Sequence, residues 1–185
     1  MEKLNGRQKK PKLKKIVVIG PESTGKSTLA SLLAKHYNTQ WVPEYAREYM
    51  NKLNRPYIEK DLLNIARGQI ASEIKLAKKA KKLLICDTNL LVLKVWSEHK
   101  FGGCYPQILD HISIRKYDLY LLTYVDLPWE EDPQREDSLL RNFYYDVYKN
   151  ELKSYGWPFV EIKGEHYERK KMAIQAIDSL LKFKK

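Results

Sequence analysis

The sequence of 185 residues carries a formal net charge of +11, with 43% hydrophobic and 31% charged residues, an ordinary globular composition. Its length fits one domain with a substantial core, no apolar run approaches the roughly 20 residues that span a bilayer, and its basic N-terminus lacks the apolar stretch of a signal peptide. Two cysteines without CxxC spacing and four scattered histidines argue against a disulfide framework or a zinc site, so we expect a reduced, cytoplasmic protein with no membrane partner.

The positive charge is concentrated at the N-terminus, where residues 1–15 hold seven basic side chains and one acidic one. The rest of the chain keeps a net +5, a modest excess for a protein that handles polyphosphates. We expect residues 1–14 to form a disordered basic tail and residues 15–185 to form one folded domain. An RNA-binding arm is the alternative, but no aromatic residue interleaves with these lysines, so nucleic acid is not the expected partner.

Strand-like and helix-like segments alternate after the tail, which is typical of a parallel sheet covered by helices. The predicted strands are residues 16–19, 40–42, 83–87, 118–123 and 158–162. The predicted helices are residues 27–37, 59–81, 90–96 and 138–152, with a basic amphipathic helix closing the chain. Five strands with intervening helices predict a three-layer α/β domain.

Two helices have apolar stripes that predict which side faces the core. For the long helix these positions are Leu62, Ala66, Ile70 and Ile74. For the helix over residues 138–152 they are Leu140, Phe143, Tyr144, Val147 and Tyr148.

The most specific motif follows the first strand. It reads Gly20, Pro21, Glu22, Ser23, Thr24, Gly25, Lys26, Ser27 and Thr28, and it fits the G-x-x-x-x-G-K-[ST] pattern of a phosphate-binding loop (P-loop). Glycines allow successive main-chain N–H groups to face phosphate oxygens, and the helix that follows adds a favourable field. Lys26 is expected to reach the β- and γ-phosphates, and Ser27 to ligate Mg²⁺. The motif predicts binding of a nucleoside triphosphate, and it does not identify the acceptor.

Asp87 ends an apolar strand, where a carboxylate in a P-loop sheet lies beside the phosphates. It is a candidate to hold Mg²⁺ or to take a proton from an acceptor hydroxyl. The alternative is a strand-end Asp that caps the next helix, and both roles are compatible.

The segment after the second strand combines a carboxylate, an arginine and two tyrosines within six residues. Glu44 could deprotonate an acceptor hydroxyl, Arg47 could pair with an anion, and Tyr45 or Tyr49 could stack on a ring. The equally supported alternative is the start of a helix with core tyrosines. Trp96, in the stretch 90–96, faces either the core, which we favour, or the acceptor.

Residues 126–137 are polar and contain proline, and we interpret them as a lid. Arg135, with Arg141 shortly after, could neutralise charge on the transferred phosphoryl group and exclude water when the lid closes, and Trp129 could anchor it. The alternative is a solvated acidic loop with incidental arginines.

Together these segments resemble the ribosylnicotinamide kinase domain of the bacterial multifunctional NAD-biosynthesis regulators and the P-loop ATPases grouped with it. The resemblance covers residues 15–165 and rests on an ordered set of motifs, of which only the P-loop is specific alone. The set is GPESTGKST (20–28), PEYAREY (43–49), IARGQ (65–69), ICDTN (85–89) and PWEEDPQR (128–135).

The resemblance implies a nucleoside/nucleotide-kinase-like parallel sheet of strand order 2-3-1-4-5 and transfer of phosphate from ATP, with Mg²⁺, to the 5′-hydroxyl of nicotinamide riboside. It implies that Lys26 and Ser27 take the phosphates and metal, that Glu44 and Asp87 face the acceptor ribose and the metal, and that Arg135 is the lid arginine.

Two departures qualify what the resemblance implies. Pro43 stands where the family often has a tryptophan that stacks on the nicotinamide ring, which leaves stacking to Tyr45, Tyr49 or Trp96, or indicates another acceptor. We expect neither an adenylyltransferase nor a DNA-binding domain in this chain. The competing hypotheses are a kinase for another nucleoside, nucleotide or small metabolite, and an ATP-binding regulatory module that is not a kinase.

Overall fold

The computed structural model describes residues 12–135 and 138–182. Most of the predicted tail, and residues Glu136 and Asp137 of the predicted lid, lie outside these residues. Within the described part, no helix is both long and apolar enough to cross a membrane.

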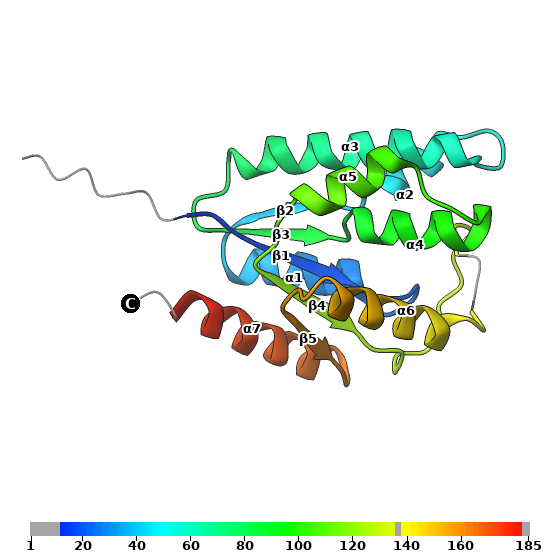
Figure 1. Ribbon diagram of the computed structural model, residues 1–185. Helices are drawn as coiled ribbons and strands as arrows, with labels where there is room; N and C mark the ends of the chain where they lie inside the picture. The colour runs from blue at the N-terminus through cyan, green and yellow to red at the C-terminus, as the bar shows by residue number, and fades with distance from the viewer. Residues whose placement is uncertain (1–11, 136–137, 183–185) are drawn as a thin grey trace, which may run out of the picture.

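Five parallel strands form one sheet in the order β2-β3-β1-β4-β5 (Figure 1), which confirms the fold class and the strand order implied by the resemblance. The strands are β1 (Lys14–Ile19), β2 (Gln40–Val42), β3 (Leu83–Asp87), β4 (Leu119–Thr123) and β5 (Phe159–Ile162). The three central strands, β3, β1 and β4, consist almost entirely of buried residues, because helices cover both of their faces.

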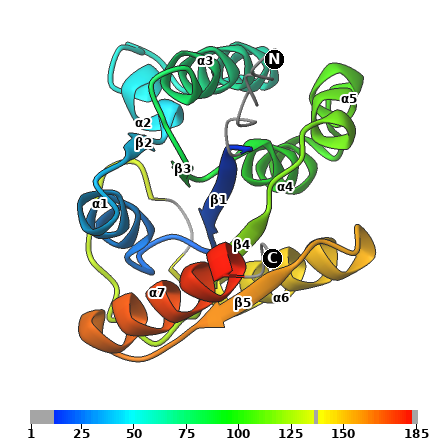
Figure 2. The same ribbon diagram turned by 90° about the vertical axis from the view of Figure 1, so that its left-hand side faces the viewer.

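Helices form the two outer layers of the domain. They are α1 (Lys26–His36), α2 (Tyr45–Met50), α3 (Glu59–Ala77), α4 (Leu90–Phe101), α5 (Pro106–Ile114), α6 (Arg141–Ser154) and α7 (His166–Lys182). Helices α1 and α7 pack on one face of the sheet, while α4 and α6 pack on the other (Figure 2). Helices α2, α3, α4 and α5 share a further cluster of buried apolar side chains beside the sheet.

The sheet brings three segments together at its carboxyl edge. In the parallel register, Val18 of β1 pairs with Asp87 of β3, and Ile19 pairs with Leu122 of β4. The loop after β1, the carboxylate at the end of β3 and the lid segment after β4 therefore meet at one edge, which is where α/β folds place their ligands.

The long helix differs from its predicted apolar stripe. Helix α3 ends at Ala77, four residues before the predicted end, and Ile74 is 48% exposed. The inward position is taken by Glu73, whose carboxylate accepts hydrogen bonds from Lys15 (2.8 Å) and Tyr117 (2.7 Å). A buried polar network thus replaces the apolar contact that periodicity predicts.

Helix α6 begins at Arg141, three residues later than predicted, and its inward face agrees with the prediction in part, since Tyr148 is buried and Tyr144 and Val147 pack against the core. Phe143 is 51% exposed, whereas Tyr145 and Leu152 are buried. Leu140, one of the predicted inward positions, precedes the helix and is therefore not part of its buried face. Helix α5 begins at a proline and was not among the predicted helices.

Candidate active site

The phosphate-binding loop runs from β1 to α1 in a conformation that its glycines permit. Gly20 has φ of 148° and Gly25 has φ of 72°, both in the region that L side chains rarely adopt. A Cβ atom on Gly20 would lie 2.3 Å from the Thr123 hydroxyl oxygen, so only glycine allows the loop to pass this close to β4. The loop is also closed internally, since Thr24 Oγ1 donates to the Pro21 carbonyl at 2.7 Å.

Lys26 is the first residue of α1, and its ammonium group donates to the Pro21 carbonyl at 2.7 Å. Burial lowers the pKa of Lys26, while the negative charges of Glu44, Asp87 and Glu22 oppose that shift. The lysine therefore sits among three carboxylates at the base of the loop. The side chains of Ser27 and Thr28, which come next, are exposed and line the cavity described below.

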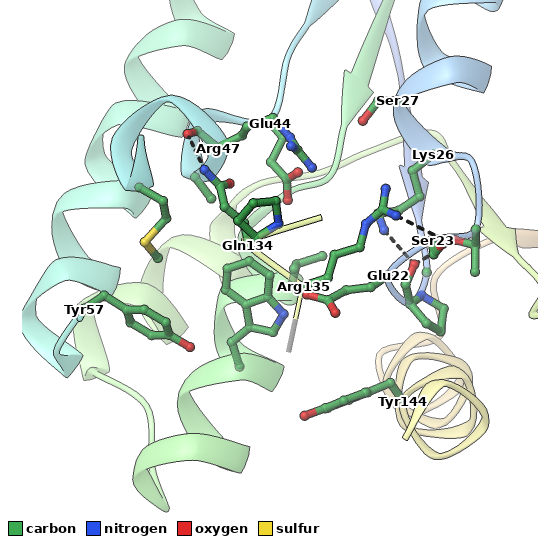
Figure 3. Close-up of a pocket in the computed structure, with 18 of the residues that line it drawn as sticks. Glu22, Ser23, Lys26, Ser27, Glu44, Arg47, Tyr57, Gln134, Arg135 and Tyr144 are labelled. Carbon is green, nitrogen blue, oxygen red and sulfur yellow. Dashed lines mark hydrogen bonds between the residues drawn. The ribbon is translucent and has the colours of Figure 1, made fainter. Parts of the chain in front are cut away.

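A cavity of about 580 Å³ extends from the phosphate-binding loop to the loop between α2 and α3 (Figure 3). Residues 20–28 form one end, and α2, α4, α6 and the segment after β4 contribute walls. Aromatic side chains also line the cavity: Tyr57 from the loop between α2 and α3, Trp96 and His99 from α4, and Tyr144 and Tyr148 from α6. A single cavity therefore joins the phosphate-binding loop to a region lined by these aromatic side chains, which we call the aromatic compartment.

Two predicted carboxylates lie near the phosphate-binding loop. Glu44 lines the cavity and points into it from the start of α2 (Figure 3). Asp87 is 1% exposed, and burial together with the charge of Glu44 raises its pKa to about 6, against the opposing effects of Ser27 and Lys26. The next residue, Thr88, has φ of 63°, an uncommon value for a β-branched residue, so the chain bends sharply after the carboxylate.

The donor set fits a hard divalent cation. The Asp87 Oδ1 atom is buried and has no hydrogen-bond partner among the described residues. Buried acceptors are normally satisfied, so this oxygen suits a ligand that the protein alone does not supply. A carboxylate and a hydroxyl, here Asp87 and Ser27, are oxygen donors of the kind that Mg²⁺ prefers.

The segment that carries Glu44 is held by α3 through two residues of the IARGQ motif. Gln69 Oε1 accepts a hydrogen bond from the Tyr45 main-chain N–H at 2.7 Å. A Cβ atom on Gly68 would lie 2.0 Å from the Tyr45 ring, so the glycine makes room for this tyrosine. The motif therefore fixes the start of α2 and, with it, the position of Glu44.

The structure does not bring Tyr45 and Tyr49 to the cavity, against the expectation that they stack on an acceptor. Tyr45 packs on Gly68, and the Tyr49 hydroxyl donates to Asp61 at 2.8 Å, so both rings face α3. Residues 45–50 are a helix whose tyrosines pack inward, as the alternative interpretation had it. Of the three aromatic candidates, Trp96 is the one that lines the cavity.

The segment after β4 contacts the phosphate-binding loop mainly through Ser23, which lies beside Arg135 in Figure 3. The Ser23 hydroxyl accepts from the Glu130 main-chain N–H at 2.8 Å and from Arg135 Nη1 at 3.3 Å, and it lies 3.2 Å from the Pro128 carbonyl. Arg135 lines the cavity beside this contact. The predicted lid arginine thus lies next to the loop in the described structure.

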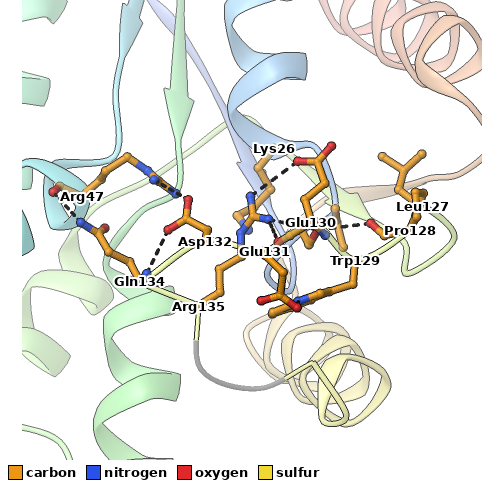
Figure 4. Close-up of polar contacts among 12 residues, drawn as sticks. Lys26, Arg47, Leu127, Pro128, Trp129, Glu130, Glu131, Asp132, Gln134 and Arg135 are labelled. Carbon is orange, nitrogen blue, oxygen red and sulfur yellow. Dashed lines mark hydrogen bonds and ion pairs between the residues drawn. The ribbon is translucent and has the colours of Figure 1, made fainter.

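The same segment also reaches α2. Arg47 Nη1 pairs with Asp132 Oδ2 at 2.8 Å, and Gln134 Nε2 donates to the Arg47 carbonyl at 3.4 Å (Figure 4). The same Gln134 nitrogen also donates to Asn51 Oδ1 at 2.5 Å. Trp129 lies between two arginines, with its ring centre 5.8 Å from Arg135 and 5.9 Å from Arg141. The predicted lid therefore bridges the phosphate-binding loop and the helix that follows Glu44.

Several cavity residues were not singled out in the sequence as site residues. Tyr57, Arg55 and Lys100 come from segments without a motif, and only the fold brings them together. Tyr144 and Tyr148 were assigned to the core by their spacing along α6, which matches a buried stripe as well as a cavity wall. Periodicity distinguishes inside from outside, and it does not distinguish core from cavity.

Comparison with known proteins gives a match to the AAA_28 family model, described as an AAA domain, across residues 15–170. Two curated relatives are the trifunctional NAD biosynthesis/regulator protein NadR of Salmonella typhimurium strain LT2, 26% identical, and of Escherichia coli K12, 27% identical, each over 161 residues. Each match covers 83% of this chain and 39% of the relative. The chain therefore spans about two fifths of the length of the curated relatives.

Solved structures with the same fold include NadR in complex with NAD and AMP-PNP, with a TM-score of 0.76 and 24% identity. NadR in complex with NR has a TM-score of 0.75 and 22% identity, and both alignments cover 91% of this chain and 49% of the other. Thymidylate kinase from Ehrlichia chaffeensis has a TM-score of 0.60 and 19% identity, covering 92% of this chain and 100% of the other. At these identities the likeness establishes the fold.

Proposed function

Since the chain belongs to the AAA domain family AAA_28, whose model matches most of its length, we propose that it is a kinase that transfers the γ-phosphoryl group of ATP to the 5′-hydroxyl of nicotinamide riboside, giving nicotinamide mononucleotide. The single observation that carries the proposal is the continuous cavity from the phosphate-binding loop to an aromatic compartment, with Glu44 on its wall. The similarity to NadR, one structure of which contains NR, supports the choice of acceptor.

The phosphate-binding loop is the proposed ATP site. Its main-chain N–H groups at residues 20–27 would cradle the phosphates, and Lys26 would exchange its present bond to Pro21 for phosphate oxygens. Ser27 and the unpartnered oxygen of Asp87 would hold Mg²⁺. When bound, the metal neutralises charge on the phosphate oxygens.

Glu44 is the proposed general base for the acceptor hydroxyl, because it lines the cavity, whereas Asp87 is buried and is the proposed metal ligand. Glu44 would take the proton of the 5′-hydroxyl as that oxygen bonds to the γ-phosphorus. The bond from the γ-phosphorus to the bridging oxygen breaks at the same centre, and ADP leaves with that oxygen's electron pair. Arg135 would stabilise the charge on the transferring group from the lid side.

The aromatic compartment of the cavity is the proposed site for the base. A pyridinium ring carries positive charge and is attracted to the faces of tryptophan and tyrosine rings. Trp96 is the proposed stacking partner in place of the residue that Pro43 replaces, with Tyr57 and Tyr144 on the neighbouring walls (Figure 3). With Trp96 in this role, the cavity would still offer a ring for stacking, although Pro43 stands where the family often has the stacking tryptophan.

A second acceptor class is favoured by one observation. Arg55, which pairs with Asp61 at 2.7 Å, and Lys100, whose ammonium group lies 3.9 Å from the centre of the Tyr57 ring, both line the cavity. Cationic side chains suit an acceptor with an anionic group, such as a nucleoside monophosphate. Thymidylate kinases, which share the fold, act on acceptors of that charge class.

A panel of acceptors with Mg-ATP tests the proposal. We expect turnover of nicotinamide riboside to nicotinamide mononucleotide, and we expect Trp96→Leu to raise KM for this acceptor by about tenfold through loss of stacking. Ile114→Ala, at an exposed residue of α5 outside the cavity lining, is the control and should behave as the parent protein. Turnover of a nucleoside monophosphate with none of nicotinamide riboside would replace the first proposal by the second.

A further inference from the structure

Two buried arginines from the last two helices contact the main chain of the phosphate-binding loop. Arg141, the first residue of α6, is 8% exposed, and Arg169 of α7 is 2% exposed. Neither side chain lines the cavity, so neither is placed to touch the acceptor there. Burying a guanidinium group away from water costs free energy, so we expect the contacts of these two arginines to have a specific role.

Arg141 joins the phosphate-binding loop to the lid. Its Nη2 atom donates to the Ser23 carbonyl at 2.9 Å and to the Leu127 carbonyl at 2.8 Å. The first contact lies inside the loop and the second at the start of the lid segment. A planar guanidinium can hold two carbonyl groups at once in a fixed geometry, which a flexible ammonium group does less well.

Arg169 holds the next carbonyl of the loop. Its Nη1 atom donates to the Thr24 carbonyl at 3.0 Å, and its Nη2 atom donates to the Tyr124 carbonyl at 3.0 Å and pairs with Asp126. Its Nε atom donates to the Gly164 carbonyl at 2.6 Å. The arginine is therefore fixed by the strand ends on both sides and offers its remaining donor to the loop.

These two contacts determine where the loop's N–H groups point. No peptide bond among the described residues is cis, so in each peptide unit the C=O and the following N–H point in opposite directions. When Arg141 draws the Ser23 carbonyl to itself, the Thr24 N–H faces away from Arg141. When Arg169 draws the Thr24 carbonyl, the Gly25 N–H faces away from Arg169.

The loop needs such anchoring at Ser23. Ser23 has φ of 53°, a left-handed conformation that serine adopts at a cost and that persists only where the surroundings hold it. Its hydroxyl is tied to the lid and its carbonyl to Arg141, so side chain and main chain are both restrained. Rotation of this peptide unit would remove one of the inward N–H groups.

We propose that Arg141 and Arg169 are positioning residues for the phosphate-binding loop: by holding the Ser23 and Thr24 carbonyls outward, they aim the Thr24 and Gly25 N–H groups at the phosphate oxygens. The inference rests on the proposed function, because it takes the loop to be a nucleotide site. Residues of α6 and α7, which lie more than a hundred positions from the loop in the sequence, would therefore help to set the affinity of the loop for phosphate.

Binding of ADP and AMP to Arg141→Lys and Arg169→Lys, each measured by calorimetry, tests the proposal. Lysine keeps the charge and loses the planar guanidinium, which in Arg141 holds both carbonyls through the two N–H groups of Nη2 and in Arg169 holds them through separate nitrogens. Because AMP lacks the second phosphate, we expect the preference for ADP over AMP to fall by roughly tenfold in both variants. This preference is a ratio of dissociation constants, so partial unfolding, which lowers both apparent affinities equally, leaves it unchanged.

Arg115→Lys is the matched control, because Arg115 is also largely buried but pairs with Glu73 at 3.0 Å, away from the phosphate-binding loop. Its ADP preference should equal that of the parent protein. If Arg169→Lys does not fold, Arg141→Lys carries the test alone. An unchanged ADP preference in folded Arg141→Lys would overturn the inference and leave the proposed function intact, whereas a parent protein that binds neither ATP nor ADP would overturn the proposed function itself.

Discussion

Arg47 of α2 and Asp132 of the lid form an ion pair of 2.8 Å that ties the helix after Glu44 to the segment covering the phosphate-binding loop. The hydrogen bond to Asp132 raises the pKa of Arg47, and the Gln134 main-chain N–H together with Arg47 lowers the pKa of Asp132, so both groups are charged near neutral pH. The acceptor side and the ATP side of the cavity are thereby connected through the lid. We therefore expect closure of the proposed lid to depend on the position of α2.

Asp132→Asn should weaken that connection. The Arg47 side chain is 46% exposed, so the pair is screened by solvent and contributes about 0.5–1 kcal/mol. We expect kcat to fall about two- to fivefold with ATP affinity unchanged, as measured by steady-state kinetics and calorimetry. Glu48→Gln removes the exposed ion pair between Glu48 of α2 and Lys52, which follows the helix, and serves as control. Equal effects of the two substitutions would show that the Arg47 link has no special role.

Arg135→Ala should act mainly on the chemical step. Arg135 lines the cavity beside Ser23, where the proposed transfer would place charge on the phosphoryl group. Interactions that strengthen in the transition state raise kcat, so we expect a loss of about 10²-fold in kcat with ATP affinity nearly unchanged. Single-turnover measurements with saturating ATP provide the check. A variant with the parent kcat would remove Arg135 from the mechanism.

The pH dependence should report Asp87. Its pKa of about 6 means that the carboxylate is ionised above pH 6 and protonated below. If the ionised form holds Mg²⁺, the ATP-dependent activity falls as the pH drops through about 6, and a profile of kcat/KM against pH will show it. A flat profile from pH 5 to 8 would contradict this assignment.

The same group should influence stability in the opposite direction. The pKa of Asp87 is raised from 3.8, so the ionised carboxylate disfavours the folded state above pH 6, and this cost disappears as the pH falls toward 4. Asp87→Asn should therefore raise the melting temperature at pH 8 by more than at pH 5, without nucleotide or metal. An equal shift at both pH values would mean that ionisation of Asp87 does not destabilise the folded state.

Gly68→Ala should disturb the site from a distance. The added Cβ would lie 2.0 Å from the Tyr45 ring, so α2 has to move and Glu44 with it. We expect a loss of about 1–3 kcal/mol in the free energy of unfolding, measured by urea titration, together with reduced kcat. The double variant Gly68→Ala, Tyr45→Leu should recover part of both.

Gly103→Ala is the matched control for that substitution. Its added Cβ would meet no atom within 4 Å, so the free energy of unfolding and the activity should stay close to those of the parent protein. A destabilisation as large as that of Gly68→Ala would refute the steric explanation.

Local patterns predicted much of this fold. The P-loop is contiguous in sequence because successive main-chain groups have to surround one ligand, and the apolar strands are continuous because both faces of the sheet are covered. The strand order came from the family resemblance that the ordered motifs carry. Contacts between segments far apart in the sequence could not be predicted, and these contacts determine which side chains line the cavity and which pack elsewhere.

Arg169 and Tyr45 illustrate that limit. Arg169 stands beside Lys170 and Lys171 in a basic stretch that indicates a solvated helix face, yet it is buried against the phosphate-binding loop. Tyr45 lies next to Glu44 in a motif that indicates a binding segment, yet Gly68 gives its ring a place on α3. In both cases the partner lies far along the chain, and residue type alone does not identify it.

Calorimetric titration of the purified chain with ATP in the presence of Mg²⁺ tests the central claim most directly. We predict saturable binding of one ATP per chain, and Lys26→Ala should weaken it strongly, because Lys26 is the cation at the base of the phosphate-binding loop. Absence of binding to both ATP and GTP by the folded protein would contradict the nucleotide site, and the acceptor and lid assignments with it.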